Sequence, residues 1–223
     1  IRIVFEGINF RRSYMKVLLI NGSSNEFGCT YTALSEVAAS LEKNGIQTEI
    51  IQIGKDAIRD CIGCGACEKT EGCIFKSDVV NEIIEKAKSA DGFIFGSPVY
   101  YAHPSGRLLS VMDRLFRAGG RYMAYKPAAA VASARRAGTT ASLDAIIKHF
   151  TLNQMPVVSS NYWPMVHGAQ NSPEDVRKDL EGMQIMRTLG NNMAWLLKSI
   201  DAGKRLGVKY PQLEEKVRTN FVR

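Results

Sequence analysis

Apolar and polar residues follow two different patterns along the chain. Short, continuous apolar runs that end near glycine, serine or asparagine are typical of strands buried on both faces of a parallel sheet. Such runs predict five strands, at 17–20, 48–53, 92–97, 128–132 and 156–159. Between them, apolar residues three and four positions apart predict amphipathic helices. These helices are expected at 30–44, 78–87, 108–116 and 140–153.

The order of these elements indicates the fold class. Strands that alternate with helices predict an α/β protein with an open, five-stranded parallel sheet and helices on both faces. Further along, Ser172 precedes Pro173 and two acidic residues, a combination that predicts a helix start, and the helix is expected to run to about residue 202. The stretch 161–168 before it is interpreted either as a lid or partner surface or as a packed connection.

The predicted elements also divide the chain. Residues 15–170 form one core domain, and residues 171–223 form a C-terminal helical segment that packs on it. Residues 1–14 precede Met15-Lys16, which is typical of a natural start. They lack the charged, apolar and small-residue succession of a signal peptide. We treat them as an N-terminal extension of uncertain origin and assign them no function.

Composition narrows the class of partner. With 45% hydrophobic and 23% charged residues, the 223-residue chain is an ordinary globular sequence rather than a disordered one. No apolar run approaches the roughly 20 residues that span a bilayer, so we expect no membrane association. The net charge is +7, but the basic residues are scattered. This distribution argues against nucleic acid and favours a small anionic cofactor.

Ligands of such sheets bind beyond the carboxyl ends of the strands, so the loops after the strands hold the candidate chemistry. The loop after the first strand combines glycines, hydroxyls and a helix start, which are the parts of a phosphate cradle. Its candidate residues are Ser23, Ser24, Asn25, Gly28, Cys29 and Thr30. The alternative is an ordinary polar connection in which Thr30 caps the helix. The loop lacks both the Walker lysine and the G-x-G-x-x-G spacing.

Two further loops carry polar or aromatic candidates. After the third strand, adjacent tyrosines can offer a flat face to an aromatic ring, or they can simply cover the sheet end. After the fourth strand, two arginines can meet carbonyl oxygens or developing negative charge, or they can form a solvated turn. The candidates are Pro98, Val99, Tyr100 and Tyr101 in the first loop, and Ser133, Arg135, Arg136, Gly138 and Thr139 in the second.

Four cysteines lie within thirteen residues, at Cys61, Cys64, Cys67 and Cys73. Three thiolates separated by two-residue gaps, with a fourth nearby, suit a cuboidal [4Fe–4S] cluster. A zinc site more often draws on two separated cysteine pairs or on cysteine and histidine. The cluster, a zinc site, and free thiols or a disulfide all remain open.

Taken together, Gly22–Asn25, Gly28, Thr30 and the run from Gly96 to Tyr100 resemble the flavodoxin-like NAD(P)H-dependent FMN reductases. The resemblance covers most of the chain from Met15 to about Ser160. It implies that Ser23–Asn25 and Thr30 hold the FMN phosphate, and that Pro98–Tyr101 and Ser133–Thr140 line the isoalloxazine ring. Ser24, Asn25 and Cys29 stand where Pro, Arg and Asn are common in the family, so an arginine–phosphate contact is not carried over.

The resemblance implies an enzyme in which FMN takes hydride from NADH or NADPH and passes electrons to a flavin, a quinone or a similar acceptor. No catalytic side chain is required, because flavin N5 carries the chemistry. Arg135 and Arg136 would stabilise the reduced ring and raise its potential. The family is commonly oligomeric, so we expect a homodimer or homotetramer. The thiols and the lack of an export signal favour the cytoplasm.

The cysteine motif resembles that of the iron–sulfur flavoproteins, although cluster-free reductases of the broader family carry similar cysteines. This resemblance implies an alternative function. The protein would then be an electron carrier in which a [4Fe–4S] cluster on the Cys61–Cys73 loop exchanges electrons with FMN and a ferredoxin-like partner.

Overall fold

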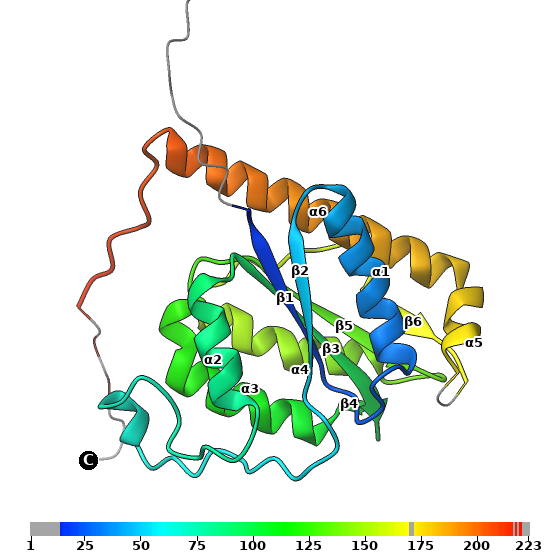
Figure 1. The fold of residues 1–223 in the computed structure, drawn as a ribbon, viewed down its shortest axis with the longest axis horizontal. Coiled ribbons are helices and arrows are strands. Elements are labelled where there is room, and N and C mark those ends of the chain that lie inside the picture. The colour runs from blue at the N-terminus through cyan, green and yellow to red at the C-terminus, as the bar shows by residue number, and fades with distance from the viewer. Residues whose placement is uncertain (1–13, 170–171, 216, 218, 220–223) are drawn as a thin grey trace, which may run out of the picture.

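The computed structural model describes residues 14–169, 172–215, 217 and 219, so all of the expected N-terminal extension except Tyr14 lies outside the described residues. Five strands form a parallel sheet in the order β2-β1-β3-β5-β6 (Figure 1). The strands are β1 (Lys16–Asn21), β2 (Gln47–Gln52), β3 (Gly92–Tyr100), β5 (Ala128–Ala134) and β6 (Met165–His167). The strand order reverses at β1, so the carboxyl ends of β1 and β3 flank the position where ligands of such sheets bind.

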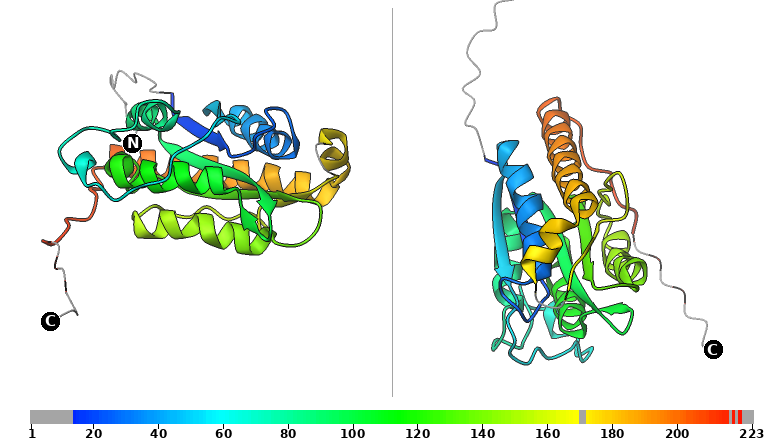
Figure 2. Two further views of the ribbon diagram at one scale, coloured as in Figure 1. Left: turned by 90° about the horizontal axis from the view of Figure 1, so that it is seen from below. Right: turned by 90° about the vertical axis from the view of Figure 1, so that its right-hand side faces the viewer.

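Helices cover both faces of the sheet, as the sequence predicts (Figures 1 and 2). On one face, α2 (Val80–Ser89), α3 (Gly106–Gly119) and α4 (Thr139–Leu152) pack on alternate strand residues such as Leu18 and Phe93. On the other face, α1 (Cys29–Lys43) and α6 (Leu180–Arg205) pack on the intervening residues such as Leu19 and Ile94. Because side chains alternate along a strand, each continuous apolar run supplies both cores. The open parallel α/β sheet is confirmed.

The third strand is longer than predicted and turns back on itself. After Val99 and Tyr100 the chain forms β4 (His103–Pro104), which pairs with β3 in antiparallel fashion. Tyr101 and Ala102 form the turn with left-handed φ values of 47° and 62°. The predicted tyrosine loop is therefore the tip of a short hairpin.

The prediction of a fifth strand at 156–159 is wrong. Val157 forms only an isolated bridge with Ala128, and the fifth strand of the sheet is β6, in the stretch interpreted as a lid or a connection. Between Val157 and β6 the chain leaves the edge of the sheet and forms hydrogen bonds with α6. Ser160 Oγ donates to Ile185 O at 2.7 Å, and Asn192 donates to Ser159 O at 2.8 Å.

The predicted single helix from residue 172 is two helices, α5 (Pro173–Lys178) and α6. The start is confirmed, since the Ser172 hydroxyl accepts from the Asp175 N–H. The break falls at Asp179, whose carboxylate caps α6 by accepting from Gly182 N at 2.9 Å and also accepts from His167 N at 2.7 Å. α6 then packs along α1, and at Gly190 the two helices lie so close that a Cβ would be 2.8 Å from Val37 O.

The division into a domain of residues 15–170 and a segment of residues 171–223 stays a prediction. Among the described residues, no helix is both long and apolar enough to cross a membrane.

Candidate functional site

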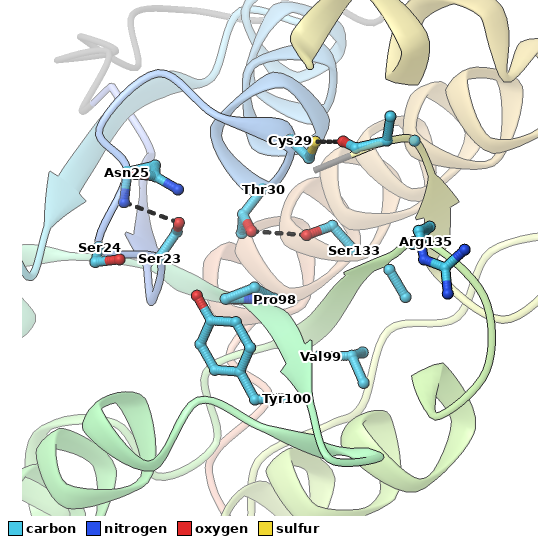
Figure 3. Close-up of a pocket in the computed structure, with 13 residues that line it drawn as sticks. Ser23, Ser24, Asn25, Cys29, Thr30, Pro98, Val99, Tyr100, Ser133 and Arg135 are labelled. Carbon is cyan, nitrogen blue, oxygen red and sulfur yellow. Dashed lines mark hydrogen bonds between the residues drawn. The ribbon is translucent and has the colours of Figure 1, made fainter. Parts of the chain in front are cut away.

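A cleft of about 460 Å³ opens at the carboxyl ends of β1, β3 and β5 (Figure 3). The three loops singled out in the sequence meet there. Ten of the predicted residues line it: Ser23, Ser24, Asn25, Cys29, Thr30, Pro98, Val99, Tyr100, Ser133 and Arg135.

The loop after β1 is held by a close approach to β3 at Gly22 and by side-chain hydrogen bonds. Gly22 N donates to Gly96 O at 2.8 Å, and a Cβ on Gly22 would lie 2.7 Å from that same oxygen. Two side-chain turns then curl the loop, since Ser23 N donates to Asn21 Oδ1 and Asn25 N donates to Ser23 Oγ. From the neighbouring strand, Gln52 Nε2 donates to Ser23 O at 2.7 Å.

The loop after β1 leads into α1, whose first residues Cys29 and Thr30 line the cleft. Gly28 is the N-cap and provides no side-chain cap, and the first turn contains no acidic residue. The first-turn N–H groups and the positive end of the helix dipole therefore remain suited to an anion. Thr30 does not cap the helix. Its buried hydroxyl instead bonds the buried Ser133 hydroxyl at 2.8 Å and so joins α1 to β5.

The hairpin brings only one of the two predicted tyrosines to the cleft. Tyr100 is half-exposed and lines the cleft beside Pro98 and Val99, which form an apolar wall. Tyr101 is fully exposed at the hairpin tip and lies outside the lining.

Four other predicted residues also lie outside the lining, namely Gly28, Arg136, Gly138 and Thr139. Arg136 is exposed. Gly138 has φ of +100°, and a Cβ there would lie 2.5 Å from Ala102 Cα, so Gly138 packs directly against the hairpin of β3 and β4. Thr139 is buried with its hydroxyl on Met165 Sδ.

Sequence reasoning missed several residues of the cleft. Ala134, Gly168 and Ala169 line it, and the Cys29 thiol donates to Ala169 O at 3.4 Å. Gln52 supports the first loop from β2. Ala134 follows the predicted strand at 128–132, and Gln52 lies near the end of the predicted strand at 48–53, so the rule that strand ends carry the site could have found both. Gly168 lies in the stretch 161–168 that was interpreted as a lid or a connection, but neither it nor Ala169 was assigned to the site, because the short strand β6 was not recognised.

The four clustered cysteines line a second, smaller pocket against α3, together with Arg114 and Arg117. Cys61 and Cys64 are exposed, whereas Cys67 and Cys73 are partly buried. Their loop lies outside the sheet, at the lower left of Figure 1, and contains a single 3-10 turn, η1 (Ala66–Glu68). Among the described residues, no three His, Cys, Asp or Glu side chains lie close enough together to hold one metal ion.

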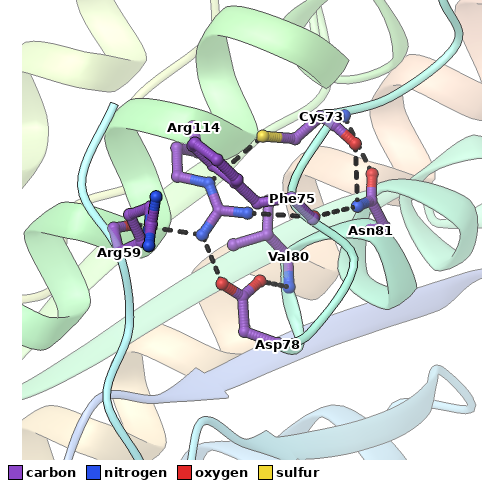
Figure 4. A network of polar contacts seen from close by, with 7 residues as sticks. All are labelled: Arg59, Cys73, Phe75, Asp78, Val80, Asn81 and Arg114. Atoms are coloured by element: carbon purple, nitrogen blue, oxygen red, sulfur yellow. Dashed lines mark hydrogen bonds and ion pairs between the residues drawn. The ribbon is translucent and has the colours of Figure 1, made fainter. Parts of the chain in front are cut away.

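A buried polar network supports this pocket (Figure 4). The Arg114 side chain is 1% exposed and forms an ion pair with Asp78, whose side chain is 5% exposed. Burial alone would lower the pKa of Arg114, but its bonds to Asp78 and Cys73 outweigh that effect and raise it. The Arg114 Nε–H donates to Cys73 Sγ at 3.2 Å.

Each site fits a particular kind of group. The cleft joins a polar end, made of hydroxyls and a helix start, to an apolar wall with an aromatic ring, and this suits a phosphate-bearing mononucleotide with a flat head. The cysteine pocket joins four thiols to a buried cation, and this suits an anionic thiolate-bound centre.

The fold and the cleft together define a flavodoxin-like protein. The structure is similar to that of a flavodoxin from the domain Archaea, with TM-score 0.54 and 14% identity over 82% of this chain and 99% of that one. It is also similar to an NAD(P)H:quinone oxidoreductase from Methanothermobacter marburgensis, with TM-score 0.60 and 16% identity over 81% and 96% of the two chains.

The sequence identifies the family. The profile of the family described as NADPH-dependent FMN reductase matches residues 15–170, and the chain belongs to this family. The chain is also 34% identical over 193 residues to an iron–sulfur flavoprotein of Methanocaldococcus jannaschii, covering 83% of this chain and 99% of the relative. The protein is therefore an NAD(P)H-dependent flavin oxidoreductase that uses FMN, as the motifs predict.

Proposed function

We propose that the cleft binds FMN and that the protein passes electrons from NAD(P)H through it to a small-molecule acceptor such as a flavin or a quinone. When bound, FMN supplies hydride acceptance at N5 and electron release in one- or two-electron steps. The observation that carries the proposal is that an uncapped helix start, a buried hydroxyl pair and an apolar aromatic wall share one cleft.

Under this proposal the chain binds and orients the cofactor. Ser23–Asn25 and the first turn of α1 hold the phosphate by N–H and hydroxyl donation. Tyr100 with Pro98 and Val99 supports one side of the ring. Ser133 and Arg135 lie toward the opposite rim, where a guanidinium stabilises negative charge on the ring. Arg136 is outside the lining, so we assign this role to Arg135 alone.

Binding and reduction test the proposal. Protein purified without oxygen is expected to be yellow, or to take up added FMN at micromolar concentration, and stopped-flow mixing with NADPH is expected to bleach the flavin. Arg135→Ala is expected to weaken FMN binding or lower its midpoint potential, whereas Arg136→Ala is the matched control and leaves both unchanged. Colourless protein that does not bind added FMN would refute the proposal.

A second function is supported by the cysteine pocket. The four thiols line one pocket beside a buried cation, and the similar protein of M. jannaschii is named an iron–sulfur flavoprotein. In this function a [4Fe–4S] cluster would exchange electrons with FMN and a ferredoxin-like partner. Iron and sulfide assays test for the cluster. Fast flavin reduction by ferredoxin with slow reduction by NADPH would favour the carrier over the reductase.

We extend the proposal to assembly and compartment. α6 carries exposed Leu180 and Trp195, which supports self-association as a homodimer or homotetramer. The five cysteines are free thiols, which supports a reducing compartment such as the cytoplasm. Light scattering of the purified protein measures the assembly.

A further inference from the structure

Cys73 is held differently from the exposed cysteines of its loop. Its N–H donates to Asn81 Oδ1 at 2.9 Å, and Asn81 Nδ2 donates to Cys73 O at 3.1 Å. One side chain of α2 therefore bonds both the backbone N–H and the backbone C=O of Cys73 (Figure 4). The preceding Gly72 is packed closely enough that a Cβ would lie 2.4 Å from Asn81 Oδ1.

The sulfur of Cys73 receives a hydrogen bond from a buried charge. Arg114 Nε donates to Cys73 Sγ at 3.2 Å, while the two terminal nitrogens donate to Arg59 O at 3.1 Å and Phe75 O at 3.2 Å. The guanidinium also pairs with Asp78 and lies over the Phe75 ring. It is therefore fixed in position and cannot leave the sulfur without breaking several contacts.

A fixed cation beside a cluster ligand has a defined electrostatic effect. Reduction of a thiolate-bound cluster adds one negative charge, and a buried cation stabilises that charge more strongly than an exposed one does. Hydrogen bonds to ligand sulfurs act in the same direction and are among the factors that set cluster potentials. Asp78 opposes the rise in potential, because its carboxylate forms an ion pair with the Arg114 guanidinium and offsets its positive charge.

We propose that Arg114 is a positioning residue for Cys73 and that it raises the reduction potential of a [4Fe–4S] cluster bound by the four cysteines. The proposal rests on the second function above, in which these thiols hold a cluster. The cysteine spacing alone does not predict this role of α3, because Arg114 lies 41 positions away from Cys73 in the sequence.

The test uses the full chain, reconstituted with iron and sulfide without oxygen. The measurements are iron and sulfide per chain and the midpoint potential followed by electron paramagnetic resonance. Arg114→Gln is expected to lower the potential, and Arg114→Lys to stay nearer the wild type because it keeps the charge. Asp78→Asn is expected to raise the potential, because it removes the opposing carboxylate. Arg121→Gln is the matched control, since Arg121 is exposed just beyond α3, and it is expected to shift nothing.

The opposite directions separate an electrostatic role from a purely structural one, which would lower the iron content of both variants without opposed potential shifts. If wild-type protein takes up no iron, the cluster and this inference fall together, and FMN binding in the cleft is unaffected. If the wild type is loaded but Arg114→Gln has the same potential, the inference alone is overturned. If Arg114→Gln retains no iron, Asp78→Asn decides, and a potential that does not rise overturns the inference.

Discussion

The cleft and the cysteine pocket are built in different ways. In the cleft, the sheet brings distant segments together: Thr30 and Ser133 are 103 positions apart, yet their hydroxyls lie 2.8 Å apart because β1, β3 and β5 are neighbouring parallel strands. In the cysteine pocket, no strand positions the thiols. A loop outside the sheet is fixed by a few side chains, of which Arg114 of α3 is the buried charged one. The Arg117–Glu68 ion pair and the bonds between Asn81 and Cys73 add to it.

This difference has a physical consequence. The geometry of the cleft depends on many backbone hydrogen bonds, so no single side chain determines it. The geometry of the cysteine loop depends on a few side-chain contacts in a low-dielectric interior, where a lost partner leaves an unsatisfied charge. Substitutions of single residues should therefore disturb the cysteine pocket more than the cleft.

The largest effect is expected from breaking the buried ion pair. Arg114→Met leaves Asp78 buried without its cation and is expected to reduce the free energy of unfolding by ~3–5 kcal/mol. The double variant Arg114→Met/Asp78→Asn should recover part of the loss, because it removes the stranded charge. Urea unfolding of metal-free protein measures both. Arg187→Met is the matched control, because it breaks the more exposed pair with Glu36. An equal loss in Arg114→Met and Arg187→Met would show that Arg114 does not anchor the loop.

Sequence alone could predict most of the cleft but not this anchor. The strand ends and their loops were visible because apolar runs, glycines and hydroxyls follow a rule that depends only on the topology. Arg114 was not visible, because a charged residue between Asp113 and Leu115 on an amphipathic helix is ordinarily solvated. Asp78 was expected at the start of the helix at 78–87, and its Oδ1 does accept from Val80 N at 3.2 Å, at the start of α2. Its pairing with Arg114 depends on tertiary packing.

The missed strand β6 has a similar explanation. Met165, Val166 and His167 form too short a run to show a period, and the more apolar run at 156–159 competed with them. Val157 pairs with Ala128 at the start of β5, bonds then join Ser159 and Ser160 to α6, and the chain returns to the end of β5 as β6. Such partners are not contained in a local pattern.

A smaller effect is expected in the cleft from the buried hydroxyl pair. Thr30→Val leaves Ser133 Oγ buried without its partner and is expected to reduce the free energy of unfolding by ~1–3 kcal/mol. FMN affinity should fall about tenfold, which corresponds to a loss of roughly 1.4 kcal/mol in binding free energy. Urea unfolding and fluorescence titration with FMN measure the two effects. The control is Thr140→Val, at an exposed position in the first turn of α4 that does not line the cleft. Unchanged FMN affinity in Thr30→Val would remove the pair from the proposed site.

A still smaller effect is expected from the support of the first loop. Gln52→Met removes the bond to Ser23 O and is expected to reduce the free energy of unfolding by ~1 kcal/mol. The loss is limited because Gln52 Oε1 is buried without a hydrogen-bond partner among the described residues, so the substitution also removes an unsatisfied group. FMN titration should show a fall of a few-fold in affinity. Gln47→Met, at an exposed position of the same strand, should leave affinity unchanged, and a similar fall there would contradict a local role for Gln52.

The smallest effect is expected from two ion pairs that share Glu49 and belong to neither site. Bonds from Lys16 and Lys86 hold the pKa of Glu49 below its ordinary value of 4.5, and its side chain is 29% exposed. The stabilisation is thus complete above about pH 4.5 and is lost as the pH falls through the lower pKa of the folded state. Glu49→Gln should flatten this acid dependence in urea unfolding between pH 3 and 7, by less than ~1 kcal/mol. Glu85→Gln, in a more exposed pair with Lys88, should change it less. If Glu49→Gln instead cost as much as Arg114→Met, burial would not be what distinguishes the anchor of the cysteine loop from an ordinary surface pair.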